Sequence, residues 1–283
     1  MPPMPTVQRY ILSMLFPARD LPAAFQATLP SIKLALTIPT LSLIALVVLF
    51  AGNSNMALFS WLNSLNQYTG DMLWANITLM GEGLLVFALM GAIAGRRPDI
   101  AWSLLVAGLL ATLLVHGLKQ LFDMPRPLLV LASSQIHVIG PELRAASFPS
   151  GHATAISLFA SVLAFHINNR RLYGILVATV IVVAASRSVV GAHWPADAAA
   201  GIGLGWLTAV VGVWLAGRAR WGLALPAQAV ICLLSLWAAS FFWDAPTGQV
   251  LAVYLQRGVA LVAGLLGLLN LLHLSLAWQR TPE

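Results

Sequence analysis

The feature that most constrains the fold is a succession of apolar stretches, each about as long as a bilayer is thick. Beginning near residue 32, the sequence carries eight runs with few or no charged side chains. A helix needs about 20 apolar residues to cross the hydrocarbon core of a membrane. The runs predict membrane-spanning helices over residues 34–51, 72–94, 100–118, 153–167, 172–191, 198–216, 223–242 and 250–278.

Two of these runs depart from the ideal length. The run at 153–167 is short, so its helix is expected to begin at the turn formed by Ser150 and Gly151. The run at 250–278 is too long for one straight span, and Arg257 indicates that its first turns lie at the membrane interface. Together the runs predict an all-α fold, a polytopic membrane helix bundle.

The composition supports the same class of protein. Of the 283 residues, 59% are hydrophobic and 8% are charged, whereas a soluble domain carries about 25% charged residues. The net charge of +6 does not indicate nucleic-acid binding, because the basic residues stand in short loops between apolar runs, where they set orientation and contact lipid headgroups. The single cysteine, Cys232, lies within an apolar run, so no internal disulfide is expected.

The first 31 residues differ from the rest of the chain. They are rich in proline, and Arg9, Arg19 and Asp20 interrupt their apolar stretches, so the layout of a signal peptide is missing. We expect a cytoplasmic or interfacial segment over 1–31, with a short interfacial helix at about 11–16.

The basic residues give the chain an orientation. With a cytoplasmic N-terminus, the inner segments hold Arg9, Arg19, Lys33, Arg96, Arg97, Arg170, Arg171, Arg218, Arg220 and Arg280. The outer segments 53–71 and 244–249 hold no Lys or Arg, as the positive-inside rule requires. The exceptions are Lys119, Arg126, Arg144, Arg187 and Arg257. Four of these five belong to three polar clusters or to the loop that joins two of them.

The three clusters fall on the same predicted outer face. The first, residues 119–127, ends the third span; the second, residues 148–152, opens the fourth; the third, residues 186–197, joins the fifth span to the sixth. In the third cluster His193 and Asp197 stand four residues apart, so on a helix the carboxylate can hold one ring nitrogen and leave the other free.

The clusters contain the groups that a phosphate would need. Ser150 and Gly151 open a helix whose free N–H groups and dipole favour an anion, and Gly151 permits a close approach of the backbone. His152 stands at the rim of that site, where an imidazole can give up a proton. Three positive charges come from Lys119, Arg126 and Arg187, and the planar guanidinium of Arg187 can donate two parallel hydrogen bonds to a phosphate. These groups describe a phosphoryl-transfer site without a metal.

The order and spacing of these residues resemble the signature of the type-2 phosphatidic acid phosphatase superfamily. Six residues separate Lys119 from the pair Arg126-Pro127, and residues 149–152 read Pro-Ser-Gly-His. The pair Ser186-Arg187 is followed after five residues by His193, and after three more by Asp197. The resemblance implies a six-helix membrane core over 32–217, followed by about two additional transmembrane helices over 218–283.

The resemblance also implies roles. His193 would be the nucleophile that forms a phosphohistidine, Asp197 would orient it, and His152 would protonate the leaving group and then activate water. The groups that bind phosphate oxygens would be Lys119, Arg126, Ser150, Gly151 and Arg187. The activity implied is metal-independent, needs no cofactor, and acts on phosphorylated lipids such as undecaprenyl pyrophosphate, phosphatidylglycerol phosphate and phosphatidic acid. The location implied is a bacterial inner membrane, with the site on its periplasmic or extracellular side.

Other functions remain open on the same residues. A lipid phosphotransferase would pass the phosphoryl group to a second lipid, and a non-catalytic membrane protein would only hold an anion in the basic pocket. The vanadium haloperoxidases of the superfamily have a similar pocket, but they are soluble proteins.

Three features outside the clusters carry expectations of their own. Glu82, inside the second run, is costly in lipid, so it should face the bundle and find a partner there. The spacing of Gly201, Gly205 and Gly212 predicts close helix–helix contact. The loop at 128–147 holds a histidine and an arginine, His137 and Arg144, which either touch a headgroup or are solvated.

Overall fold

The structure is a computed structural model that describes residues 25–51, 54–167, 169–245 and 250–278. Within these ranges the chain forms helices and no strand. The α-helices are α2 (Ile32–Phe50), α3 (Ser54–Ser64), α4 (Asn66–Thr69), α5 (Asp71–Leu79), α6 (Gly83–Ala94), α7 (Pro98–Phe122), α8 (Pro127–Val130), α9 (Gly151–His166), α10 (Arg170–Val189), α11 (Pro195–Arg218), α12 (Leu225–Asp244) and α13 (Val253–Trp278). Two 3-10 turns, Arg220–Leu223 and Val250–Ala252, precede α12 and α13. The interfacial helix expected at 11–16, with most of the segment 1–31, lies outside the described residues.

The expected all-α membrane bundle is confirmed. In the part of the chain that the structure describes, six segments are long and apolar enough to cross a bilayer, namely Ile32–Phe50, Pro98–Val130, Arg170–Val189, Pro195–Arg218, Leu225–Asp244 and Val250–Leu276. The bent pair α5 and α6 makes a seventh crossing if it counts as one span, and α9 is a shorter apolar helix of 16 residues. Many large apolar side chains on these helices are exposed, as in a protein whose outer surface faces lipid.

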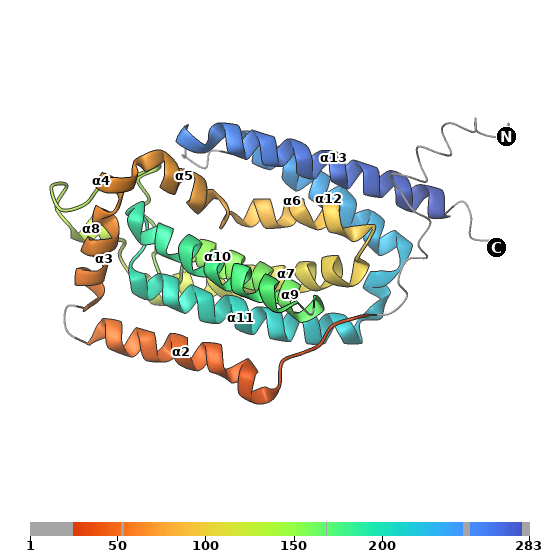
Figure 1. Ribbon diagram of the computed structural model, residues 1–283, viewed down its shortest axis with the longest axis horizontal. Helices are drawn as coiled ribbons and strands as arrows, with labels where there is room; N and C mark the ends of the chain where they lie inside the picture. Colours follow the sequence, from red (N-terminus) through yellow and green to blue (C-terminus); the bar gives the residue numbers. More distant parts are fainter. Residues whose placement is uncertain (1–24, 52–53, 168, 246–249, 279–283) are drawn as a thin grey trace.

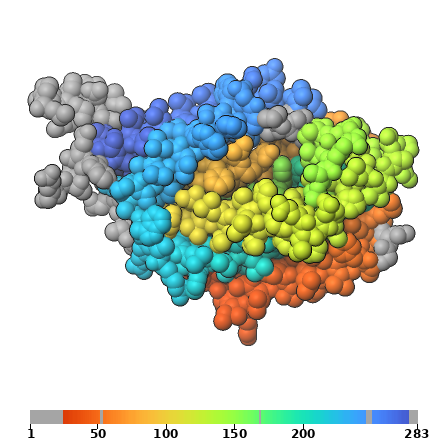
Figure 2. Space-filling view, turned by 180° about the vertical axis from the view of Figure 1, so that it is seen from behind, coloured from red at the N-terminus to blue at the C-terminus, as the bar shows by residue number. Residues whose placement is uncertain are grey.

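Helices α9 and α11 form the centre of the bundle (Figure 1). Helices α7 and α10 pack around them, and α2 packs on α11. The hairpin α12–α13 packs mainly on α6, and Figure 2 shows this hairpin in blue along the gold and yellow helices α6 and α7. Because α9 and α11 both begin at the end where α7 and α10 finish, four helix ends meet there.

Glycines allow α9 and α11 to approach closely, as their spacing predicts. A Cβ built on Gly201 would lie 2.6 Å from the Ser150 carbonyl oxygen. One built on Gly205 would meet the Thr154 carbonyl oxygen and lie 2.7 Å from Ser157 Cβ. Further along α11, a Cβ on Gly212 would lie 2.5 Å from Ala107 Cβ of α7. In membranes, small residues at an interface let backbones pack closely, and here they hold α11 against two neighbours.

The second span, predicted at 72–94, is interrupted in the structure. The span is broken at residues 80–82, and its two halves, α5 and α6, meet at a bend of 54°. The sequence Gly81-Glu82-Gly83 accounts for the break, because glycine weakens a helix and Glu82 adopts an extended conformation with ψ of 126°. The break lies against the start of α9, since a Cβ on Gly81 would lie 2.8 Å from His152 Cβ.

The hairpin α12–α13 fastens α6 through specific contacts. The side-chain amide of Asn270 donates to the carbonyl oxygens of Gly91 and Ala92, at 2.8 and 2.9 Å. A Cβ on Gly91 would lie 2.6 Å from Ser235 Cβ, so α12 also touches this helix closely. Helices α12 and α13 therefore hold α6, the half of the span that follows the break, in place.

Gly205→Ala should destabilise the protein by about 1–3 kcal/mol, because its methyl group would overlap the α9 backbone. Gly174→Ala is the matched control, since nothing lies within 4 Å of a Cβ there and alanine is the better helix former. Thermal unfolding in detergent should give a lower Tm for the first variant and an equal or higher Tm for the second. Equal Tm values for Gly205→Ala and the wild type would contradict the packing described.

Candidate active site

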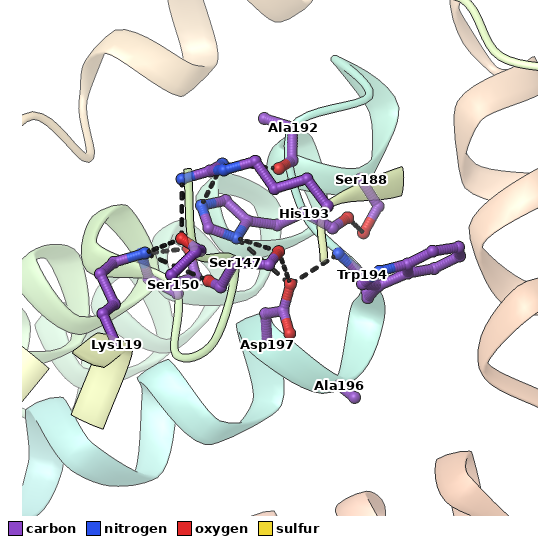
Figure 3. Close-up of polar contacts among 12 residues, drawn as sticks. Lys119, Ser147, Ser150, Ser188, Ala192, His193, Trp194, Ala196 and Asp197 are labelled. Carbon is purple, nitrogen blue, oxygen red and sulfur yellow. Dashed lines mark hydrogen bonds and ion pairs between the residues drawn. The ribbon is translucent and has the colours of Figure 1, made fainter. Parts of the chain in front are cut away.

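The three polar clusters meet at one end of the bundle. Lys119 lies near the end of α7, and Arg126 follows in the next connection. Ser150, Gly151 and His152 open α9. The third cluster runs from the end of α10 into α11, and Figure 3 draws its His193 and Asp197 beside Lys119 and Ser150. The structure thus brings together all eight residues selected from the sequence: Lys119, Arg126, Ser150, Gly151, His152, Arg187, His193 and Asp197.

His193 stands on a tight connection between α10 and α11. The backbone N–H groups of Ala192 and His193 both donate to the Arg187 carbonyl oxygen, at 2.9 and 3.1 Å. Gly191, with φ of 76°, supplies the left-handed conformation that this turn requires. The Ser188 hydroxyl donates to the His193 carbonyl oxygen at 3.0 Å. Both the N–H group and the carbonyl oxygen of His193 are therefore hydrogen-bonded, which fixes the backbone that carries the imidazole.

The contacts of the His193 ring define its tautomer. Nε2 lies 3.2 Å from Arg126 Nη1, and a guanidinium can only donate, so Nε2 carries the lone pair. Nδ1 then carries the proton and lies 3.3 Å from Asp197 Oδ2 and 3.3 Å from Ser147 Oγ. An imidazole held in this way presents an unprotonated Nε2, which is the form that can attack phosphorus.

Asp197 is buried, and one of its carboxylate oxygens has several partners. Its Oδ2 accepts the Ser147 hydroxyl at 2.5 Å and the Trp194 backbone N–H at 2.9 Å, in addition to the contact with His193. The residue lies in the first turn of α11, where the positive end of the helix dipole favours a carboxylate. With 1% of its surface exposed, this carboxylate orients His193 and remains inaccessible to substrate.

Ser147 is a member of the site that sequence reasoning missed. The side chain is fully buried, and its hydroxyl bridges Asp197 and His193 (Figure 3). The only signal in the sequence is its place one residue before Phe148, which opens the second cluster. A lone serine in a long loop does not reveal a contact with a carboxylate 50 residues away.

Lys119 and Arg126 hold the loop before α9 against the site. Lys119 Nζ donates to the carbonyl oxygens of Ala146 and Ser147, at 2.7 and 3.2 Å. Arg126 Nε donates to the Ala145 carbonyl at 2.8 Å, while Nη1 donates to the Ala192 carbonyl at 2.8 Å. These two cations therefore join the segment 145–147 to the turn that carries His193.

Arg187 has unused hydrogen-bonding capacity. Its Nη1 donates to the hydroxyl of Thr78 in α5, another contact that the sequence did not reveal. Arg187 is only 3% exposed, and its Nε is buried with no hydrogen-bond partner among the described residues. A buried charged donor without a partner is costly, so an anion bound beside it would satisfy the group.

Two helix N-termini point into the site. The Ser150 hydroxyl caps α9 by accepting from Ala153 N–H at 3.4 Å, and its own proton remains to be donated. The Ser150 N–H donates to the Asp197 carbonyl at 3.0 Å, which joins the first turns of α9 and α11. Since the first N–H groups of a helix have no partner within it, the backbone at Gly151 and His152 adds donors for an anion.

The surroundings of His193 keep it neutral. Burial, followed by the fields of Arg126, Arg187 and Lys119, lowers the pKa of His193 well below 6.5. A hydrogen bond with the backbone of Ser147 opposes this lowering of the pKa and does not cancel it. At neutral pH the imidazole therefore has a free lone pair.

The loop that covers this end is tied to the rest of the bundle. Asn63 of α3 accepts from His137 N–H at 2.9 Å and donates to the carbonyl oxygens of His137 and Val189. The His137 ring lies 3.0 Å from both carboxylate oxygens of Asp71. Arg144 pairs with Glu142 at the exposed surface. His137 thus fastens the loop, and Arg144 lies at the solvated surface.

The arrangement suits the capture of a tetrahedral anion and an attack upon it. Among the described residues, no group of three or more His, Cys, Asp or Glu side chains is arranged to hold a metal ion. The positive groups present are two guanidinium ions, one ammonium ion and two helix N-termini. They surround a neutral imidazole whose free nitrogen faces the same space.

Comparisons with known proteins were made on sequence and on structure. Residues 100–221 match the model of the PAP2 superfamily. The fold is similar to the crystal structure of Aquifex aeolicus LpxE, with 26% identity, a TM-score of 0.54, and 58% of this chain and 97% of that chain covered. It is also similar to a transmembrane PAP2 type phosphatidylglycerolphosphate phosphatase from Bacillus subtilis, with 22% identity, a TM-score of 0.50, and 65% and 96% covered. A search of curated protein sequences found no significant match.

Arg187→Gln should weaken the binding of inorganic phosphate by about 10- to 100-fold, because a buried charge-assisted donor is lost. Arg257→Gln is the matched control, since Arg257 is half exposed and pairs with Asp244 outside the site. Calorimetric titration of the purified protein with phosphate measures both. Unchanged affinity in Arg187→Gln would show that the anion binds elsewhere.

Proposed function

We propose that this chain, whose residues 100–221 match the model of the PAP2 superfamily, hydrolyses lipid phosphates through a phosphohistidine. The observation that carries the proposal is the His193 ring, whose Nδ1 contacts Asp197 while Nε2 faces a guanidinium. Such a ring is oriented, neutral and unprotonated at the attacking atom. A site that only holds an anion does not need these properties.

In the first step, the substrate phosphate takes the place that the Arg126 guanidinium occupies beside His193 Nε2. The guanidinium ions of Arg126 and Arg187, the Lys119 ammonium and the N–H groups that open α9 bind its oxygens. The Nε2 lone pair attacks phosphorus, and the bond from phosphorus to the lipid oxygen breaks. His152 gives a proton to that oxygen, and Asp197 stabilises the positive charge that develops on the His193 ring.

In the second step, a water molecule attacks the phosphohistidine from the side that the lipid alcohol has left. His152, now neutral, takes a proton from this water. The bond between phosphorus and Nε2 breaks, and the electron pair returns to the His193 ring. Phosphate leaves, and both histidines regain their starting states. Each step uses side chains of the chain itself, and the proposal includes no metal ion.

The site faces the outer side of a bacterial inner membrane in this proposal. The helix ends opposite the site carry Arg96 and Arg97 before α7, Arg170 and Arg171 at the start of α10, Arg218 at the end of α11 and Arg220 just after it. Cytoplasmic loops hold an excess of Lys and Arg, so these ends lie inside and the site outside. A lipid phosphate in the outer leaflet would reach the site from the headgroup region.

The substrate class is a phosphorylated membrane lipid. Undecaprenyl pyrophosphate, phosphatidylglycerol phosphate and phosphatidic acid are the first candidates. Transfer of the phosphoryl group to another lipid would use the same residues and differ only in the acceptor, so analysis of the products separates it from hydrolysis.

His193→Ala should abolish phosphate release from each of these lipids in detergent, by at least about 1000-fold, because the nucleophile is lost. His116→Ala is the matched control: His116 lies exposed on α7, and its Nδ1 contacts the Thr112 carbonyl of its own helix. Phosphate release should also persist in EDTA and stop with vanadate, a phosphate mimic. Undiminished release by His193→Ala, or a requirement for magnesium, would overturn the mechanism.

The pH dependence follows from the lowered pKa of His193. Since only the neutral ring attacks, kcat/KM should stay high on the acid side to a pH below 6.5 and fall as the ring becomes protonated. Arg126→Gln removes a positive charge that lowers this pKa, so the pKa rises and the acid limb moves to higher pH. The measurement is kcat/KM against pH for the wild type and Arg126→Gln on the same substrate. Ionisation of the substrate affects both profiles equally, so it does not contribute to the difference between them. An acid limb that stays in place, or moves lower, would contradict this role for Arg126.

A further inference from the structure

A second carboxylate, Glu82, lies at the other histidine of the site. Its Oε1 is 3.8 Å from His152 Nε2, and both side chains are about three-quarters buried, with 26% and 23% exposed. Glu82 stands outside the matched residues 100–221, in the break between α5 and α6. The partner expected for this intramembrane glutamate is therefore His152.

The backbone around Glu82 is shaped to reach His152. A Cβ at Gly81 would lie 2.8 Å from His152 Cβ and 3.1 Å from its ring carbon Cδ2, so glycine permits this contact. One turn earlier, Thr78 accepts from Arg187. The break thus brings a hydroxyl to a phosphate-binding arginine and a carboxylate to the proton-transferring histidine.

The break is supported from outside the six-helix core. Ala75 and Leu79 of α5 and Leu85 of α6 pack in one buried cluster with Phe242 of α12 and Ala260 of α13. Helix α6 is also fastened by the Asn270 amide. These contacts stabilise the bend in the broken span. An isolated helix in lipid would instead keep its backbone hydrogen bonds unbroken.

From this geometry we propose that Glu82 is a positioning residue for His152, as Asp197 is for His193. This inference rests on the proposed phosphatase function. Glu82 accepts the Nε2 proton of His152, and Nδ1 then exchanges the catalytic proton. The separation of 3.8 Å shortens when the ring becomes positive, as catalytic contacts commonly tighten with substrate bound.

Glu82 balances a strongly positive surrounding. The charged or titratable groups that act on His152 are Arg187 of α10, His193 before α11, Arg126 directly before α8, and Lys119 of α7, while Glu82 itself interacts with Arg187. All the groups that act on His152 disfavour an imidazolium, whereas general-acid catalysis requires one. A carboxylate beside the ring stabilises the protonated state without touching the phosphate.

The proton balance is simple. In the first step, the phosphorus–oxygen bond to the lipid breaks as phosphorus bonds to His193 Nε2, and the Nδ1 proton of His152 moves to the leaving oxygen. In the second step, a proton of the attacking water returns to Nδ1 as the phosphorus–nitrogen bond breaks. The Nε2 proton stays on His152, directed at Glu82 throughout.

The test compares two leaving groups. An alkoxide from a lipid phosphate is strongly basic and needs a general acid, whereas p-nitrophenolate leaves as a stable anion. Glu82→Gln should therefore lower kcat/KM for a lipid phosphate by about 10- to 100-fold and for p-nitrophenyl phosphate by less than about 3-fold. The quantity kcat/KM reports the first irreversible step, in which the leaving group departs, so slower hydrolysis of the phosphoenzyme does not obscure it.

The control is Glu142→Gln, the same substitution at an exposed glutamate of the covering loop, which should leave both values unchanged. Equal loss on both substrates, or no loss on either, would overturn the role of Glu82. Should Glu82→Gln fail to fold, Glu82→Asp retracts the carboxylate by one methylene and must show the same selective loss. If the wild type releases phosphate from neither substrate, the proposed function itself fails, which is a different outcome from failure at Glu82.

Discussion

The close packing of α9 against α11 is the constraint on which the site depends. Both helices begin at the same end of the bundle, so their positive dipole ends converge there. Gly201 and Gly205 bring the two backbones together, and the hydrogen bond from Ser150 N–H to the Asp197 carbonyl joins their first turns. His152 on α9 and His193 before α11 are thereby held at the same end of the bundle. A larger side chain at either glycine would separate the helices and with them the two halves of the site.

The sequence was sufficient to predict the membrane bundle and the grouping of the three clusters. The apolar runs have the length of a bilayer, and Lys119, Arg126 and Arg187 violate the positive-inside rule at a single end of the molecule. The site contacts of Ser147 and Thr78 could not be predicted, because each is one hydroxyl whose partner is distant in the sequence. The break at residues 80–82 was also missed, since mean hydropathy measures apolarity over a window and does not register a change in backbone direction. Gly81-Glu82-Gly83 was the available signal for it.

The broken span gives the last two helices a structural role. Helices α12 and α13 lie outside the six-helix core expected from the sequence, yet they pack on α6 and close over α5. Their polar contacts, such as the Asn270 amide on the carbonyls of Gly91 and Ala92, are directional bonds in a lipid environment, where apolar contact alone provides little specificity. Through α6 they support the wall of the site that faces His152.

The central claim is that His193 Nε2 forms a covalent bond to phosphorus. The most direct measurement is a rapid alkaline quench of wild-type protein during turnover of p-nitrophenyl phosphate, followed by mass spectrometry of its peptides. A phosphohistidine is stable to base and labile to acid, so the account predicts a phosphoryl group on His193 after alkaline quench that acid treatment removes. Turnover without any label on His193, or with a phosphoryl group on another residue, would contradict it.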